Sequence, residues 1–543
     1  MTYRIRVVAA ALALCLVLTA CAAPHSVSSD ELRARADSTK NYLSIIDYEP
    51  DTVDPQCTSE YYTIALNVFD RLVEVRTNDN GGSRIVPSLA ESWTVDEDGY
   101  VYSFHLREGV RFSNGAELTA SDVGYTLSRI MTYPASCHKD LFSCIFGAEA
   151  LLNGSATKLA GFVAHGDYDF SIILSYPCAS FLARLSTPAA SILDEGTTFS
   201  AGGLFGTVAE QTVGTGPFIF TRWVHDSELL LTANPYCWAG APLCDGIDIK
   251  IAPDSDVQSV LFSNGSLDVL DLDSMGSESE YFIRGDIYQD RLYCCPRVGI
   301  SYVVLNENVE PLSDVRVRKA LQLALDRQLL LTAVLGGRGA LENGIFPHGL
   351  VGYNPELPEI PYDPQEAVRL LSEAGYGNGF DLTISLPDNS SQTKIEISEL
   401  IAYMWQQIGI NAQLEVLDTD NFTARRKSGI LACYYGRWSA DYNDPENFID
   451  TFFGSEENTQ SRCLCYHDES VMARIQAAHG ILGETERIRE YRELERKIVQ
   501  EDAAWIPLFS GSHYYVVSER VEGFQPPWNG WSNNRYNNVS VIG

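Results

Sequence analysis

Residues 380–417 contain two strand patterns around one helix pattern, namely FDLTISL (380–386), IEISELIAYMWQQI (395–408) and INAQLEVL (410–417). The first segment alternates apolar and polar residues, as a half-buried strand does, and the last is typical of the next strand. The middle segment has the character of a helix, and Gly409 follows it where helix ends favour glycine. A strand–helix–strand order predicts parallel strands covered by helices, so we expect an α/β fold with a mostly parallel sheet.

The preceding segment carries the signals of another helix. Asp363, Pro364 and Glu366 occupy the N-cap, N1 and N3 positions that favour these residue types. Ala367, Leu370, Leu371 and Ala374 then form one apolar stripe, and Gly375 follows as a C′ residue. A helix over 364–374 extends the alternation of helices and strands.

After these elements comes the stretch YYGRWSADYNDP (434–445), which combines aromatic residues, one arginine and two acids around Gly436. It has no helical or strand period, and Pro445 lacks an N–H, so we expect a loop that leaves a strand ending near Cys433. Ligands of open α/β sheets collect beyond the carboxyl ends of the strands. The stretch is therefore a candidate wall of a binding cleft.

A second interpretation of this stretch is a surface loop that packs on its own core. Asp441 or Asp444 would then only cap the helix near Phe448. The residues alone do not favour one interpretation over the other.

The N-terminus predicts export. Arg4 and Arg6 precede the uncharged apolar run 7–18, which is short for a membrane span but suits the core of a signal peptide. Cys21 follows Leu18-Thr19-Ala20, and a small residue before cysteine resembles a bacterial lipobox. We expect 1–20 to be a lipoprotein signal peptide, Cys21 the lipidated first residue, and 21–40 a polar tether. The alternative is an ordinary cleaved signal with an incidental cysteine.

Composition excludes several classes of protein. The formal net charge of −33 makes nucleic acid and anionic membrane surfaces poor partners. The 13 cysteines suit an oxidising compartment, and Cys137/Cys144 and Cys237/Cys244 are candidate local disulfides. Cys463, Cys465 and His467 lack the usual zinc spacing, so we expect no metal. Hydrolase, phosphate-loop and dinucleotide motifs are absent from the sequence, so we expect no enzyme and no cofactor.

An ordered set of segments resembles the large solute-binding proteins of peptide-type ABC importers. Each has the form that recurs at the same place in that family, and the resemblance as a whole covers about 42–525. They are LAESWTVDEDGYVYSFHLREGVRFSNGAELTASDVGYTLSR (89–129), VGTGPF (213–218), NPYCW (234–238), NGSLD (264–268) and DVRVRKAL (314–321). We therefore identify the chain as a member of this family by resemblance.

The resemblance implies two α/β lobes joined by crossing strands, with an extra subdomain inserted in the first. Carried onto this chain, lobe I comprises 41–84, 212–300 and 516–543. The inserted subdomain comprises 85–211, and lobe II comprises 301–515. Ligand would bind in the cleft between the lobes and favour the closed state.

The segment WSADYNDP (438–445) closely resembles one in oligopeptide- and dipeptide-binding members, whose aspartate pairs with the peptide ammonium. Asp441 takes that position. Gly436, Trp438 and the turn Cys57-Thr58-Ser59 are expected to contact the peptide main chain. Other expected ligand-binding residues are Tyr435, Tyr442, Asn443 and Arg437. Core packing is the alternative role for each aromatic residue, and for Arg437 an ion pair with a nearby acid is the favoured alternative.

The expected function is capture of di- or oligopeptides by a protein anchored through Cys21 to the outer face of the cytoplasmic membrane. The expected partners are a peptide, the permease and the membrane, and the expected state is a monomer. Alternatives are a family member that binds a nickel chelate, a sugar or haem, or a surface lipoprotein that binds or hydrolyses peptides without importing them.

Overall fold

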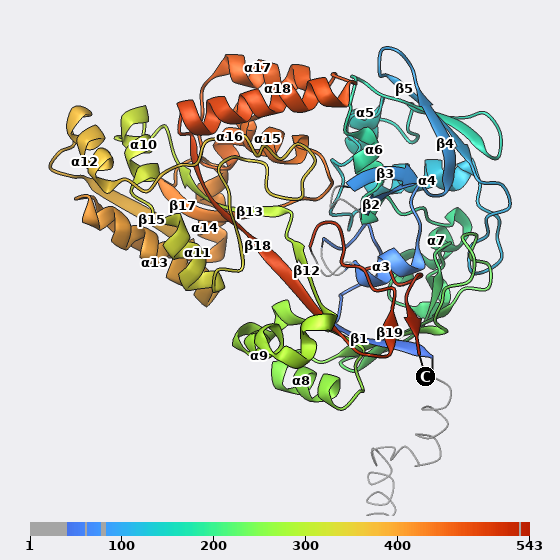
Figure 1. Ribbon diagram of the computed structural model, residues 1–543. Helices are drawn as coiled ribbons and strands as arrows, with labels where there is room; N and C mark the ends of the chain where they lie inside the picture. Colours follow the sequence, from blue (N-terminus) through green and yellow to red (C-terminus); the bar gives the residue numbers. More distant parts are fainter. Residues whose placement is uncertain (1–40, 60–61, 78–82, 531–533, 543) are drawn as a thin grey trace, which may run out of the picture.

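The computed structural model describes residues 41–59, 62–77, 83–530 and 534–542. Its main sheet follows the order β16-β15-β17-β13-β18-β11-β1-β10-β9-β8 and extends through two groups of helices. The strand that joins the two halves is β18 (Trp505–Val517), whose first half pairs with β13 and whose second half pairs with β11 and β12. Figure 1 shows β18 crossing between the two lobes.

Lobe I is built on the sheet half that contains β1. Its strands are β1 (Tyr42–Asp47), β8 (Phe218–Val224), β9 (Glu228–Ala233), β10 (Gly246–Ile251), β11 (Val269–Asp271) and β12 (Leu292–Pro296). Its helices are α3 (Thr63–Val68), α8 (Ser255–Ser263) and α9 (Ser279–Arg284). The chain ends beside this half, where β19 (Val521–Glu522) pairs with β20 (Ser540–Val541).

A smaller antiparallel sheet of order β4-β5-β7-β6 lies beyond lobe I. Its strands are β4 (Ala90–Val95), β5 (Val101–Leu106), β6 (Phe162–Ala164) and β7 (Asp169–Ile173). The helices in the same stretch of chain are α4 (Ala120–Thr132), α5 (Ala148–Leu152), α6 (Phe181–Leu185) and α7 (Glu195–Ala201). The hairpin of β2 (Val73–Thr77) and β3 (Ser83–Pro87) leads from lobe I to it.

Lobe II surrounds the other half of the main sheet. Its strands are β13 (Gly299–Leu305), β14 (Gly339–Leu341), β15 (Asp381–Pro387), β16 (Asn411–Leu417) and β17 (Cys433–Ser439). Its helices are α10 (Val315–Leu323), α11 (Arg327–Leu335), α12 (Pro364–Glu373), α13 (Gln392–Gln407), α14 (Thr419–Lys427), α15 (Glu446–Phe453), α16 (Glu456–Ser461), α17 (Glu469–Ala478) and α18 (Glu484–Arg496).

Two apolar clusters cover the two faces of the lobe II sheet. Val303 and Tyr435 belong to one cluster, and Val304 and Tyr434 belong to the other. Successive residues of a strand point to opposite faces, so β13 and β17 contribute to both cores. A sheet buried on both faces fixes the position of every residue at the end of β17.

The elements expected from the sequence between 362 and 417 are confirmed. β15 and β16 pair in parallel and α13 connects them. Asp363 caps α12 by accepting a hydrogen bond from the Glu366 N–H (2.9 Å), and Gly375 has a φ of +92°. The two-lobed α/β fold class is confirmed as well.

Two expectations are wrong. Residues 434–439 form strand β17, not a loop, because each of them pairs with a residue of β13 and the aromatic side chains fill the two cores. The disulfides Cys137/Cys144 and Cys237/Cys244 are also not formed, since all eleven cysteines of the described residues are free thiols. Cys137 is exposed while Cys144 is buried in the core.

Candidate functional site

A cleft of about 1120 Å³ lies between the lobes. This volume is slightly above the usual range for small-molecule sites. Lobe II contributes Ser439, Ala440 and Asp441 to its wall. Lobe I and the C-terminal segment contribute most of the rest, including Ser59, Tyr62, Arg71, Trp238, Asp271, Trp528 and Arg535.

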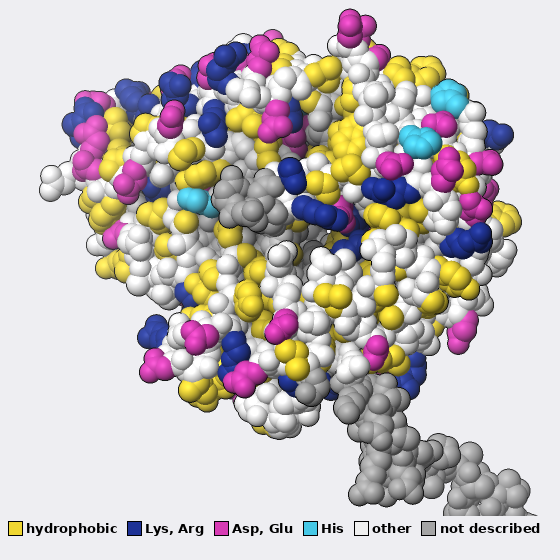
Figure 2. Space-filling model, turned by 45° about the vertical axis from the view of Figure 1, so that its right-hand side comes forward, with side chains coloured by type: hydrophobic (Ala, Val, Ile, Leu, Met, Phe, Trp, Pro, Cys, Tyr) yellow, Lys and Arg dark blue, Asp and Glu magenta, His cyan; other side chains and the backbone are white. Residues whose placement is uncertain are grey.

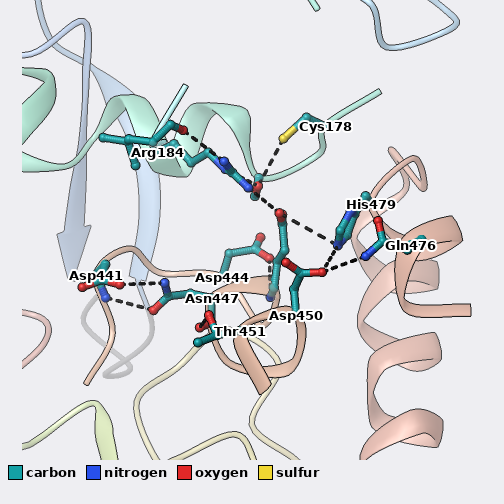
Figure 3. A network of polar contacts seen from close by, with 12 residues as sticks. Cys178, Arg184, Asp441, Asp444, Asn447, Asp450, Thr451, Gln476 and His479 are labelled. Carbon is teal, nitrogen blue, oxygen red and sulfur yellow. Dashed lines mark hydrogen bonds and ion pairs between the residues drawn. The ribbon is translucent and has the colours of Figure 1, made fainter. Parts of the chain in front are cut away.

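Asp441 stands where β17 ends and the chain turns into α15. The residue before Asp441 is held in place, because the Ala440 N–H donates a hydrogen bond to the Val298 carbonyl oxygen (2.9 Å). Asn447 on α15 then clamps Asp441 twice: its Oδ1 accepts from the Asp441 N–H (3.0 Å), and its Nδ2 donates to Asp441 Oδ2 (2.9 Å) (Figure 3). Among the described residues Asp441 Oδ1 has no hydrogen-bond donor, so this oxygen remains available to a ligand.

The environment of Asp441 suits an ammonium group. The side chain is exposed to the cleft. The surrounding protein nevertheless raises the pKa of its carboxyl through desolvation, although the Asn447 hydrogen bond opposes this shift. A carboxylate whose charge is poorly solvated gains from a cation that brings both charge and donors.

The loop after Asp441 is held by buried ion pairs. Arg487 on α18 donates to both oxygens of Asp444 (2.7 and 2.6 Å), and Asp444 Oδ1 also accepts from the Glu446 N–H (3.0 Å) at the start of α15. The expected structural role of Asp444 is therefore observed, whereas Asp441 is not the cap of this helix.

The same loop contacts the opposite side of the cleft. Arg184 on α6 donates to Glu446 Oε1 (2.5 Å); the Glu446 side chain is buried, and that of Arg184 is 12% exposed. His479 lies 3.3 Å from Asp450 Oδ1 in the same network (Figure 3). Its backbone carbonyl accepts from the Ala179 N–H (2.9 Å). Lobe II is thus held against the stretch of chain that contains α6, beside Asp441.

Three expected ligand contacts lie away from the cleft wall. Tyr435 is buried and its hydroxyl bonds to Ser301 (3.0 Å). Gly436 faces the Tyr302 ring, which leaves no room for a Cβ. Tyr442 is buried with its ring 5.5 Å from the Arg184 guanidinium carbon. Tyr435 and Tyr442 therefore have the alternative role and pack in the core.

Other expected contacts support the loop or its neighbours. Trp438 donates from Nε1 to the Asn447 carbonyl oxygen (3.1 Å). Asn443 accepts from the Val351 N–H (3.0 Å) and donates to Ser83 across the lobes. The Arg437 side chain is exposed, and the ion pair expected for it is not found among the described residues. It lines a second, much smaller hollow that shares Ser439 with the cleft.

The turn 57–59 reaches the cleft with its last residue. Ser59 is exposed and lines the cleft, while Cys57 donates to Asp54 Oδ2 (3.3 Å). The Thr58 carbonyl oxygen lies 2.7 Å from His138 Nε2. Of the ten expected ligand-binding residues, the cleft wall brings together Asp441 and Ser59.

Arg71, Trp238 and Arg535 line the cleft but were not predicted as site residues. Trp238 lies in the segment 234–238, which resembles the solute-binding family. Arg71 follows a short helix, and Arg535 belongs to the C-terminal segment. No local motif marks either arginine. They meet only because the C-terminal segment packs against the start of lobe I, where Asn67 bonds to the Asn534 carbonyl oxygen (2.8 Å).

One group within the described ranges has the geometry of a metal site, namely Asp271, Asp273 and His513. Its members already pair with one another: His513 Nε2 lies 2.7 Å from Asp271 Oδ1, and Arg297 pairs with Asp273. The candidate zinc ligands Cys463 and Cys465 donate instead to backbone carbonyls of Arg426 and Gly429.

Two lobes joined by a crossing strand, with a ligand-sized cleft between them, define a solute-binding protein. The family model for bacterial extracellular solute-binding proteins, family 5, matches residues 84–460, and the chain belongs to this family.

Relatives match over almost their whole length. The chain is 30% identical to the di/tripeptide-binding protein 4 of Pseudomonas aeruginosa, covering 98% of both chains. It is 28% identical to the heme-binding protein A of Haemophilus influenzae, covering 94% of both. The solved structure of HbpA2 from Haemophilus parasuis superposes with a TM-score of 0.78 at 26% identity, over 92% of this chain and 99% of that one.

Proposed function

We propose that the protein captures short peptides in the interlobe cleft and delivers them to the permease of an ABC importer. The observation that carries this proposal is Asp441, a carboxylate fixed at the end of β17 with one oxygen facing the cleft and without a donor among the described residues. A desolvated peptide ammonium needs such a partner. The di/tripeptide-binding relative supports the same ligand class.

Ligand would favour closure because it contacts both lobes. Asp441 belongs to lobe II, while Ser59 and Trp238 belong to lobe I and its connections. A ligand shifts the open–closed equilibrium by its difference in affinity for the two states. The closed form would be the one that docks on the permease. A transport assay in cells distinguishes import from binding without import.

Haem is the second candidate because of the heme-binding relative. A haem iron needs an axial histidine, cysteine, methionine or tyrosine. His138 lines the cleft, but its Nε2 lies 2.7 Å from the Thr58 carbonyl oxygen and 3.0 Å from the Tyr62 hydroxyl. This engagement of Nε2 argues against His138 as an axial ligand. Native mass spectrometry of the purified protein distinguishes peptide from haem by the mass of the ligand that stays bound.

Asp441→Ala tests the ammonium clamp. Loss of the carboxylate should weaken a free peptide at least about thirtyfold, as for other buried charge pairs, while thermal unfolding changes little. An N-acetylated peptide, which has no ammonium, should bind the wild type and the variant about equally. Because the ionised carboxylate binds the ammonium, wild-type affinity should fall as pH drops through the raised pKa of Asp441. Unchanged affinity of the variant in calorimetry would refute the clamp.

We further propose that the protein is anchored by a lipid on Cys21, which lies outside the described residues together with the signal sequence 1–20. Within the described ranges no helix is long and apolar enough to cross a membrane. If the lipid on Cys21 is the anchor, Cys21→Ala should move the protein from the membrane fraction to the soluble extracytoplasmic fraction. A variant that still sediments with membranes contradicts the lipid anchor.

A further inference from the structure

Two cysteines from distant parts of the chain meet at the edge of the cleft. Cys57 belongs to the turn before α3, and Cys137 belongs to the loop that follows α4. Close neighbours of the two cysteines, Ser59 and His138, line the cleft. Figure 2 shows the molecule hollowed on the face that it presents, with Lys and Arg side chains beside the hollow. A covalent link between Cys57 and Cys137 would therefore act on the wall of the site.

The backbones of the two segments run side by side. The Cys137 N–H donates to the Gln56 carbonyl oxygen (3.0 Å). On the next residues, His138 Nε2 lies 2.7 Å from the Thr58 carbonyl oxygen. Since the Gln56 carbonyl belongs to the peptide group that precedes Cys57, the Cα atoms of Cys57 and Cys137 lie within about 7 Å of each other. That separation is within the reach of a disulfide, which joins Cα atoms up to about 7 Å apart.

The turn that carries Cys57 is anchored on α4. Arg129 donates to Asp54 Oδ2 (2.6 Å) and to Gln56 Oε1 (2.6 Å), and the Arg129 and Asp54 side chains are 7% and 3% exposed. Cys57 Sγ donates to Asp54 Oδ2 (3.3 Å). When this thiol turns away, Asp54 still accepts from Arg129 and from the Gln56 N–H (3.0 Å). Rotation of Cys57 toward Cys137 thus leaves no buried carboxylate without a donor.

The two thiols differ in their reactivity. Cys137 is exposed, whereas Cys57 is half-buried. Burial and the neighbouring Asp54 raise the pKa of the Cys57 thiol to about 12, so the exposed Cys137 is the thiol that reacts first. The chain belongs to a family of extracellular proteins, and disulfides form and persist outside the cytosol. The pair therefore lies in an environment that favours its oxidation.

We propose that Cys57 and Cys137 form a disulfide that fixes this edge of the cleft. The Cys137 thiolate attacks the disulfide of an extracytoplasmic thiol oxidoreductase, and Cys57 then displaces that protein from the mixed disulfide. In total the two cysteines lose two protons and two electrons, and the disulfide of the oxidant becomes a dithiol. The bond closes a long loop, since the neighbouring Thr58 and His138 are 80 residues apart, and longer loops gain more from closure. The proposal does not depend on which ligand the cleft binds.

Peptide mapping tests the connectivity. The exported wild-type protein is denatured with N-ethylmaleimide, which blocks free thiols, and is digested without a reductant. Mass spectrometry should find the peptides of Cys57 and Cys137 joined, and reduction should separate them. Maleimide on both cysteines, or either cysteine joined to a different partner, would overturn the proposal. This measurement does not depend on the folding of a variant.

Thermal unfolding tests the constraint that the bond imposes. Oxidised wild type should unfold about 3 °C or more above the protein reduced with dithiothreitol. Cys57→Ser and Cys137→Ser should each abolish this difference. The control is Cys294→Ser, which removes an exposed thiol on β12 and should preserve the difference. A difference that persists in Cys57→Ser would assign the stabilising bond to other cysteines and overturn this pairing.

Discussion

The buried carboxylate of Glu495 contributes to the pH dependence of the stability of this fold. Glu495 on α18 is fully buried, and its Oε1 accepts from the N–H groups of Ile345 (2.7 Å) and Phe346 (2.9 Å). Burial raises the pKa of Glu495 to about 8, and the two hydrogen bonds oppose the shift. From about pH 4.5 to 8 the folded state therefore keeps a proton that the unfolded chain loses, so this group's contribution to stability falls as pH rises through that window.

Glu495→Gln should raise the free energy of unfolding at pH 9 by up to about 5 kcal/mol and change it little at pH 5. The amide oxygen still accepts from the two N–H groups, and no charge has to be buried. Denaturant unfolding at both pH values measures the difference. Glu486→Gln on the exposed face of the same helix is the control. Parallel pH profiles for wild type and Glu495→Gln would show that Glu495 does not titrate in this range.

At the scale of the element, strand β17 requires glycine at the position that pairs with Tyr302 of β13. Gly436 pairs with Tyr302 on β13, and a Cβ at Gly436 would lie 2.7 Å from the Tyr302 ring. That ring cannot move away easily, because it stacks on Trp505 with centroids 4.5 Å apart and packs edge-on to Phe452 at 5.2 Å. The strand that positions Asp441 therefore depends on a glycine in its middle.

Gly436→Ala should destabilise the protein by about 1–3 kcal/mol, the usual cost of overpacking a core. Gly166→Ala is the control, since its Cβ would meet no atom within 4 Å, and it should be nearly neutral. Thermal or denaturant unfolding measures both variants. A Gly436→Ala protein as stable as wild type would mean that the sheet relaxes around the methyl group.

At the scale of the whole molecule, the Arg184–Glu446 pair joins the two sides of the cleft. Its Glu446 side chain is buried, and Glu446 directly precedes Asn447, whose side chain bonds to Asp441. The interface that closes the cleft and the carboxylate that faces it thus share the start of α15. We therefore expect closure and ligand binding to be coupled through this helix terminus.

Arg184→Met should leave the Glu446 carboxylate buried without its partner and so favour the open state. Peptide affinity should fall about tenfold or more, and the ligand-bound radius of gyration from small-angle scattering should increase. Arg474→Met, which removes a half-exposed pair with Glu490 within lobe II, should leave both unchanged. Wild-type compactness and affinity in Arg184→Met would show that this pair does not stabilise the closed state.

The sequence by itself determined the α/β class, the α12 cap and the β15–α13–β16 unit, because these depend on residues close together in the chain. It also placed Asp441 in a candidate binding wall. The strand nature of 434–439 could not be predicted, since its pairing partner β13 lies more than a hundred residues away. The tertiary structure alone decided which side chains face the cleft, because Arg71 and Arg535 are brought together only when the C-terminal segment packs on lobe I.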